Sequence, residues 1–189
     1  MVPSLCVERN TMKLIQVKTP YQWLRFCLLY RRAFPSSERK PVSIIRKKQK
    51  EGTTDVWYLE RDGKFVGLVA TINSPEIILV DYLAIHDACR GNGNGSLALK
   101  KLREQYAGKG VFVEIECLYE DADNYEERRR RKQFYLRNGM NEMHTTAKLF
   151  GVDMELLGYD CQLSFEEYHE FYRTNYGEWA ASHITPAGK

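Results

Sequence analysis

The chain has 189 residues, a length that fits one domain with a short terminal extension. Hydrophobic residues make up 43% of it, so the chain can build a substantial core and is not expected to be disordered. Its formal net charge of +3 is close to neutral, which argues against a general nucleic-acid-binding role.

The five cysteines and four histidines are scattered along the chain, and no C-x-x-C pair occurs. Neither a disulfide framework nor a metal site is therefore expected. No run approaches roughly 18 consecutive apolar residues, so no membrane span is predicted. Because the N-terminus also lacks an apolar signal core, the sequence predicts a cytoplasmic protein with reduced cysteines.

The N-terminal quarter of the chain predicts one strand and two helices. Residues 12–18 alternate between apolar and polar side chains, as in a strand. Thr19 is a suitable N-cap and Pro20 a suitable first residue for the helix that follows, and Pro35 ends that helix. A short second helix is predicted over 41–50.

The period then changes from helix to strand. Asp62 and Gly63 lie between two β-rich runs and predict a hairpin. Residues 76–85 are almost continuously apolar, which is typical of a strand buried on both faces. A glycine-rich run follows this strand and leads into a helix predicted over 93–107.

The remaining patterns predict a strand over 110–119, a helix over 124–139 and two strands with a turn near Gly151. Five aromatic residues then follow at helical spacing: Phe165, Tyr168, Tyr172, Tyr176 and Trp179. The chain thus divides into a disordered leader (1–11), one domain (12–163) and an aromatic C-terminal segment (164–189). That segment would cover the sheet or mediate a homodimer. The order of elements predicts an α/β or α+β domain with a mixed sheet.

The glycine-rich run "RGNGNG" occupies residues 90–95. Ser96 stands where both the dinucleotide fingerprint and the nucleotide P-loop require a glycine, so neither motif is present. The run nevertheless lies between a buried strand and the start of a helix. A helix N-terminus exposes amide groups and a partial positive charge, and glycines let those amides approach a pyrophosphate closely.

The pattern Arg90-x-x-Gly93-x-Gly95 resembles the acetyl-coenzyme A loop of the GNAT superfamily of N-acetyltransferases. The later run "FYLRNG" (134–139) and the order of elements over 12–161 resemble the same family, and "E-x-E" before that run is similar to bacterial members. The resemblance implies a mixed, mostly antiparallel sheet of six to seven strands flanked by helices. Its fourth and fifth strands would splay apart to admit the coenzyme.

The resemblance also implies acetyl-CoA as co-substrate, no metal, and a set of coenzyme contacts. These are the backbone of Leu83, Ala84 and Ile85, the loop residues Arg90, Gly91, Asn92, Gly93, Asn94, Gly95 and Ser96, and, on weaker correspondence, Asn124.

Acetyl transfer to an amine needs a group that accepts the amine proton and one that protonates the leaving thiolate. The resemblance implies that Tyr135 is the acid. A backbone amide near residues 83–85 is suited to stabilise the oxyanion. The glutamate that some members carry as the base is absent, because Leu79 stands at that position.

Three other carboxylates are candidates for the base or for holding a cationic amine. Glu114 and Glu116 share one face of a strand by period two, and burial of a charge there is costly unless it serves a purpose. Asp81, with its neighbour Tyr82, lies on the expected acceptor side. The alternative is that these carboxylates pair with arginines or face solvent.

The function predicted from the sequence is N-acetyl transfer to a primary amine of a small molecule or peptide that the sequence does not identify. A non-catalytic acyl-CoA-binding or regulatory module on the same fold is the alternative. The basic run 128–132 invites a nucleic-acid-binding interpretation, but its residues point in several directions on a helix, and the near-neutral net charge argues against it. No partnership with nucleic acid or membrane is expected.

Overall fold

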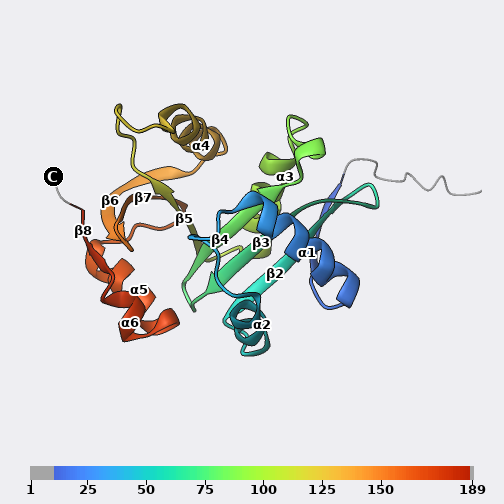
Figure 1. Ribbon diagram of the computed structural model, residues 1–189, viewed down its shortest axis with the longest axis horizontal. Coiled ribbons are helices and arrows are strands. Elements are labelled where there is room, and N and C mark those ends of the chain that lie inside the picture. The colour runs from blue at the N-terminus through green and yellow to red at the C-terminus, as the bar shows by residue number, and fades with distance from the viewer. Residues whose placement is uncertain (1–10, 188–189) are drawn as a thin grey trace, which may run out of the picture.

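The computed structural model describes residues 11–187, so residues 1–10 of the expected leader lie outside the described chain. Its elements, in chain order, are β1 (Met12–Gln16), α1 (Pro20–Ala33), α2 (Val42–Lys50), β2 (Thr54–Arg61), β3 (Lys64–Asn73), β4 (Ile77–Ile85), the 3-10 turn η1 (Asp87–Cys89), α3 (Asn94–Gln105), β5 (Gly110–Glu116), α4 (Tyr125–Arg137), β6 (Asn141–Leu149), β7 (Val152–Tyr159), α5 (Phe165–Tyr176), α6 (Glu178–Ala181) and β8 (Ile184–Pro186). Figure 1 shows their arrangement.

The strands form a single sheet in the order β1-β2-β3-β4-β5-β7-β6-β8. Only the β4–β5 pair is parallel among the strands described, which confirms the predicted mixed, mostly antiparallel sheet. The sheet has eight strands rather than six to seven, because Ile184–Pro186 adds a short strand to the outer edge of β6. Three residues that include a proline carry no strand pattern, so the sequence did not predict this edge strand.

The parallel pair β4–β5 is short, and this confirms the predicted splay. Pairing runs only from Ile77↔Gly110 to Leu79↔Phe112. The β3–β4 register then skips Asp81, which is a bulge on β4. Past the bulge, β4 continues along β3 but no longer pairs with β5, so a gap opens between the two halves of the sheet on either side of this junction (Figure 1).

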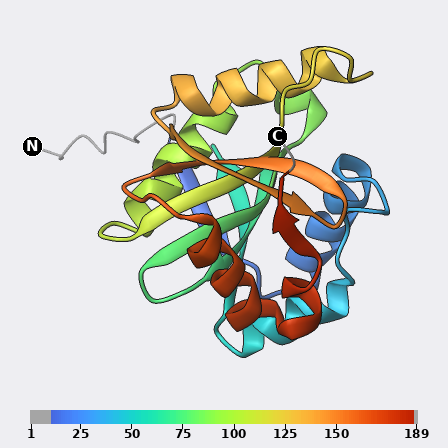
Figure 2. The same cartoon turned by 90° about the vertical axis from the view of Figure 1, so that its left-hand side faces the viewer.

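Helices cover both faces of the sheet, and consecutive residues of β4 alternate between them. Ile78 packs with Leu99 and Leu102 of α3, whereas Leu79 packs in the cluster that contains Phe171 of α5. Helix α1 packs over the other half of the α5 face. Figure 2 shows α4 and α5 on opposite sides of the strands between them. The gap therefore has α4 on one side and α5 on the other.

Local sequence signals act where they were expected at the start of α1 and at the β2–β3 turn. Thr19 and Gln22 form a capping box at the start of α1, and Pro20 is its first residue. Asp62 (φ 50°) and Gly63 (φ 74°) both adopt the left-handed conformation that a tight hairpin turn requires. These predictions are confirmed.

The aromatic C-terminal segment is not one helix. Tyr168 and Tyr172 are buried on α5, but Gly177 (φ 85°) ends that helix and starts α6. Trp179 lies on α6 and is 70% exposed, so the five aromatic residues do not share one helix. Among residues 11–187, no helix combines the length and apolar character that a membrane span needs.

Candidate active site

The glycine loop presents a row of backbone amides that have no partner in the described part of the chain. Gly91 (φ 79°) and Gly93 (φ 73°) are both left-handed, and Gly93 is the N-cap of α3 without a capping side chain. Within residues 11–187, no protein atom accepts a hydrogen bond from the amides of residues 91–96. Because these amides surround the positive end of a helix, the loop is suited to hold a phosphate group.

The loop is packed against the second motif that the sequence singled out. A Cβ atom at Gly95 would lie 3.0 Å from Cζ of Phe134, closer than ordinary contact. Glycine at this position therefore lets the first turn of α3 meet α4. The run that starts at Phe134 supports the loop directly, although the two are far apart in the sequence.

Two side chains fix the shape of the loop from inside. Asn94 is buried; its Nδ2 donates to the carbonyl of Cys89 (2.8 Å), and its Oδ1 accepts from Nη1 of Arg61 (2.7 Å). Arg61 also donates to the carbonyl of Asn92 (2.9 Å). The Asn94 side chain thus holds the loop together, and only the backbone N–H of Asn94 is left for a ligand. Arg61 lies at the end of β2, and no local pattern pointed to it.

Arg90 is held beside the loop and remains accessible. Its Nε donates to the carbonyl of Ile85 (3.1 Å), and its guanidinium pairs with Asp87 (3.1 Å). The side chain is 60% exposed. A cation therefore lies at the end of β4, next to the free amides.

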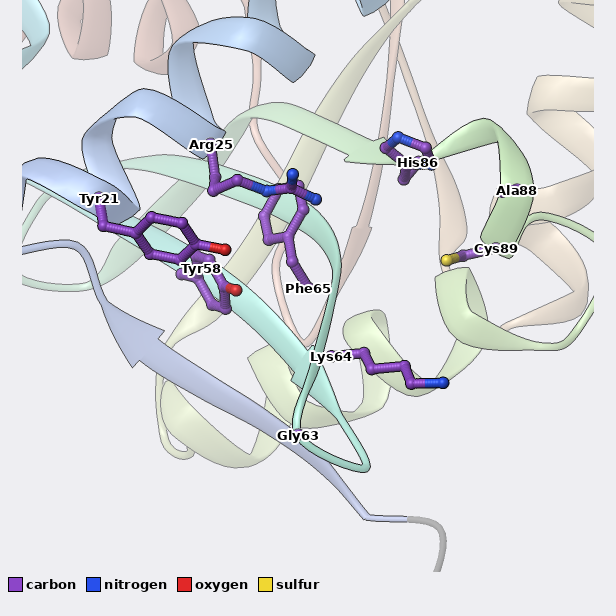
Figure 3. Close-up of a pocket in the computed structure, with 9 residues that line it drawn as sticks. All are labelled: Tyr21, Arg25, Tyr58, Gly63, Lys64, Phe65, His86, Ala88 and Cys89. Carbon is purple, nitrogen blue, oxygen red and sulfur yellow. The ribbon is translucent and has the colours of Figure 1, made fainter.

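A hollow of about 430 Å³ lies next to the start of the loop (Figure 3). It is lined by Tyr21, Arg25, Tyr58, Gly63, Lys64, Phe65, His86, Ala88 and Cys89. The guanidinium of Arg25 lies over the Phe65 ring, 4.9 Å from its centroid. These residues come from α1, the β2–β3 hairpin and the β4–α3 connection, and none comes from β5. The hollow is therefore separate from the gap between β4 and β5.

The connection between α1 and α2 contacts β4 just past the point where its pairing with β5 ends. The Nζ atom of Lys40 lies 2.7 and 2.8 Å from the two carboxylate oxygens of Asp81, and it also donates to the Tyr176 hydroxyl (2.7 Å). The Tyr82 hydroxyl accepts from the Lys40 amide (3.2 Å) and donates to the carbonyl of Glu38 (2.8 Å). Asp81 and Tyr82 thus both contact the same connecting segment, which borders a second hollow of about 270 Å³.

Glu114 faces the same end of the gap from β5. Its carboxylate accepts hydrogen bonds from the hydroxyls of Tyr168 (2.8 Å) and Tyr172 (2.8 and 3.0 Å) on α5. Burial raises the pKa of Glu114 to about 7, although the tyrosine hydrogen bonds oppose the shift. A carboxyl group with that pKa can gain or lose a proton near neutral pH.

Glu116 has a different environment. Its carboxylate pairs with Arg128 (2.9 Å) and Arg131 (3.1 Å) of α4, and its side chain is 21% exposed. For this residue the alternative drawn from the sequence, pairing with arginines, describes the structure. The two glutamates of "VEIE" are therefore separated: Glu114 bonds to α5, and Glu116 bonds to α4.

The remaining groups of α4 are also engaged. Asn124 accepts from Nε of Arg128 (2.7 Å) through its side-chain oxygen, which leaves its Nδ2 available. Lys132 pairs with Glu142 (3.0 Å) and Glu155 (2.6 Å). Much of the basic run 128–132 thus forms ion pairs within the protein instead of one basic face, which argues further against the nucleic-acid-binding interpretation.

Tyr135 is half-buried among apolar side chains next to the loop helix. Its hydroxyl makes no hydrogen bond to any of residues 11–187. Burial raises the pKa of Tyr135 to about 12, and the nearby Arg131 charge partly offsets the shift. The phenol therefore stays protonated at neutral pH and has a proton to donate. In the described part of the chain, no cluster of His, Cys, Asp and Glu has a metal-binding arrangement.

A mixed sheet that splays at its single parallel pair, beside a loop of free amides at a helix N-terminus, defines an acetyltransferase fold. Residues 52–141 match the family model of the acetyltransferase (GNAT) domain. This match spans just under half of the chain, and solved acetyltransferases share its fold. No curated protein matches it by sequence.

Solved structures agree with this fold. A protein assigned to the GNAT acetyltransferase family from Bacteroides thetaiotaomicron matches with a TM-score of 0.74 at 19% identity, covering 88% of this chain and 98% of that one. An aminoglycoside 6'-N-acetyltransferase in complex with coenzyme A matches with a TM-score of 0.63 at 14% identity, covering 78% and 95%. A spermidine N-acetyltransferase from Vibrio cholerae matches with a TM-score of 0.60 at 12% identity, covering 79% and 93%.

Proposed function

We propose that this acetyltransferase moves an acetyl group from acetyl-CoA directly to a primary amine of a small molecule or peptide. The observation that carries this proposal is the row of unpartnered amides over residues 91–96, placed where β4 opens away from β5. Acetyl-CoA, when bound, supplies a thioester whose carbonyl carbon an amine can attack. The GNAT structures solved with coenzyme A or acetyl-CoA support this choice of donor.

The chain offers suitable groups along the whole coenzyme. The amides of residues 91–96, with Arg90 beside them, would bind the pyrophosphate. The backbone of Leu83, Ala84 and Ile85 pairs with β3 on one side and has no strand partner on the side of β5. That free edge would bind the pantetheine arm and donate to the carbonyl oxygen. Asn124 stays a candidate contact through its Nδ2.

We assign the two proton transfers to residues on opposite sides of the gap. Glu114 accepts the proton of the attacking amine, because its pKa of about 7 lets it be deprotonated at neutral pH. Tyr135 donates a proton to the leaving sulfur, because its hydroxyl is protonated at neutral pH and is not engaged by another group among residues 11–187. Glu116, with both carboxylate oxygens bound to arginines, holds α4 against β5 and is not the favoured base.

The acceptor would enter at the end formed by Asp81, Tyr82 and Glu114. The related enzymes named for aminoglycoside and spermidine acetylation act on amines, which supports an amine acceptor here. We also propose a cytoplasmic location, which the free cysteines of the described chain support. The homodimer expected from the aromatic segment stays a prediction.

Two measurements on the full chain test this function. Calorimetric titration with acetyl-CoA should show binding, and an amine panel should show release of free thiol. The panel should contain an aminoglycoside, spermidine, free lysine and peptides with a free N-terminus. No detectable binding at millimolar coenzyme would overturn the proposal. Binding without turnover on any amine would favour the alternative, a non-catalytic acyl-CoA-binding module.

A further inference from the structure

The amine of Lys40 lies where the gap between β4 and β5 begins. Pairing between β4 and β5 ends at Leu79↔Phe112, and Asp81 and Glu114 each stand two residues beyond that point. Lys40 bonds to Asp81, whose side chain is only 10% exposed, while Lys40 itself is 30% exposed. Lys40 also bonds to the Tyr176 hydroxyl, the Tyr176 ring lies 5.0 Å from that of Tyr172, and the Tyr172 hydroxyl bonds to Glu114.

The arrangement holds this amine in one place. Two hydrogen bonds to Asp81 and one to Tyr176 fix the Nζ atom, and the Lys40 amide is bonded to the Tyr82 hydroxyl. Lys48 provides a contrast. Its Nζ also reaches α5, where it donates to the carbonyl of Asn175 (2.7 Å), but no carboxylate among residues 11–187 pairs with it.

We propose that Lys40 is an internal acceptor, so that its amine takes an acetyl group from the bound donor and Lys40 is a modification site of this protein. The inference rests on the proposed function, because that function supplies the acetyl-CoA. Its structural basis is that Lys40 occupies the position where Asp81 would hold an incoming amine.

The chemistry balances with the residues present. Asp81 takes one proton from the Lys40 ammonium and leaves a neutral amine. The nitrogen lone pair forms a bond to the acetyl carbonyl carbon, and the bond from that carbon to sulfur breaks, so sulfur leaves with the bonding pair. Glu114 takes the second amine proton, and Tyr135 protonates the sulfur. Acetylation also removes the positive charge that neutralises Asp81, so the acceptor end becomes net negative.

The main test is a time course on the purified full chain with acetyl-CoA and no added amine, followed by peptide mass analysis. Lys40 should gain one acetyl group about tenfold faster than Lys48 or the exposed Lys47, because the fold holds its amine near the donor. The same chain unfolded in denaturant should lose this preference. Lys40→Arg should abolish the preferred modification, and Lys48→Arg should leave it unchanged. Equal rates at Lys40 and Lys47 would overturn the proposal.

A second readout does not depend on acetyl transfer. Coenzyme A without an acetyl group should slow reductive methylation of Lys40 several-fold and leave Lys48 unaffected. Calorimetry on the same sample tells a failure of the Lys40 proposal from a failure of the proposed function. If the coenzyme binds and Lys40 is neither protected nor acetylated, the Lys40 proposal is wrong while the proposed function stands. If no coenzyme binds, both are wrong.

Discussion

The glycine loop, proposed to bind the coenzyme, and the proposed acceptor end of the gap are built in opposite ways. The loop is one short segment, and its functional groups are backbone amides that glycine conformations at residues 91 and 93 expose. The acceptor end is assembled from side chains of four distant segments: Lys40, Asp81, Glu114 and the tyrosines of α5. The first kind of site is set by local sequence, and the second exists only once the chain has folded.

This difference also separates donor from acceptor recognition. In the proposed function, the amides bind the phosphate groups of the donor. The acceptor end combines one ion pair with one carboxyl group that titrates near neutral pH. Changes at the acceptor end should therefore alter catalysis with little effect on coenzyme binding, and changes in the loop should do the reverse.

The largest effect is expected at Glu114. Glu114→Gln keeps an oxygen that can accept from Tyr168 and Tyr172 but removes the proposed base. Turnover should fall by about 10³-fold, within the range of lost general base catalysis. Coenzyme affinity, measured by calorimetry, should change less than about threefold, because the loop is untouched.

Glu116→Gln is the informative comparison for that variant, since both glutamates lie on β5. Removing the Glu116 charge breaks its ion pairs with Arg128 and Arg131, so the melting temperature should fall. Turnover of the remaining folded protein should stay much closer to that of the original chain. If Glu116→Gln reduced turnover more than Glu114→Gln, the assignment of the base would be reversed.

Local signals in the sequence account for the parts of the fold that were predicted correctly. The capping box at Thr19, the turn at Asp62 and Gly63, and the glycines of the loop all act through the backbone within a few residues. Each has a conformational requirement that few residue types meet. The eighth strand was missed because tertiary pairing with β6, not its own composition, makes residues 184–186 extended.

The acceptor end could not be predicted to the same depth. Glu114 and Glu116 have the same spacing from apolar neighbours, and nothing local indicates that one bonds to tyrosines and the other to arginines. No pattern in the sequence singled out Lys40. The period of four between Tyr168, Tyr172 and Tyr176 was visible, and it could have indicated one face of hydroxyl groups on α5. Which carboxylate they reach depends on the packing of α5.

The second prediction concerns the other side of the gap. Tyr135→Phe should lower turnover by about 10²-fold, because the leaving sulfur loses its proposed proton donor. Coenzyme affinity should stay within about threefold, since the hydroxyl makes no hydrogen bond to residues 11–187 and its loss leaves the fold intact. Tyr119→Phe removes an exposed hydroxyl that bonds to Asp153 and serves as the control. Equal turnover in Tyr135→Phe and the original chain would remove the acid role.

The loop is tested by a pair of glycine variants. Gly93→Ala and Gly108→Ala both place a Cβ at a left-handed residue (φ 73° and 85°), and neither Cβ would meet a neighbour within 4 Å. Each should cost about 1 kcal/mol of stability through backbone strain. Only Gly93→Ala should weaken acetyl-CoA binding, by about tenfold in calorimetry, because Gly93 positions the amides. Equal affinities in the two variants would contradict the role of the loop.

The smallest effect is expected from Tyr172→Phe, and it depends on pH. The Tyr172 hydroxyl donates to the charged form of Glu114 and so lowers its pKa against the larger effect of burial. Its removal should raise that pKa above about 7. Since the base works only when deprotonated, the acidic limb of the pH–rate profile should move to higher pH, by about half a unit for one hydrogen bond. Tyr168→Phe, which removes a single contact, should move it less.

The pH dependence of stability independently tests whether the pKa of Glu114 is raised. Glu114 has a higher pKa in the folded chain (about 7) than its ordinary value of 4.5, so folding takes up a proton between those values. Stability should therefore fall as pH rises from 4.5 to about 7, and Glu114→Gln should remove this dependence. Tyr172→Phe should extend the fall to higher pH. Thermal melts at pH 5 and pH 8 measure both variants. A pH dependence that Glu114→Gln leaves unchanged would show that Glu114 is not the buried titrating group of the gap, and the base assignment would lose its physical support.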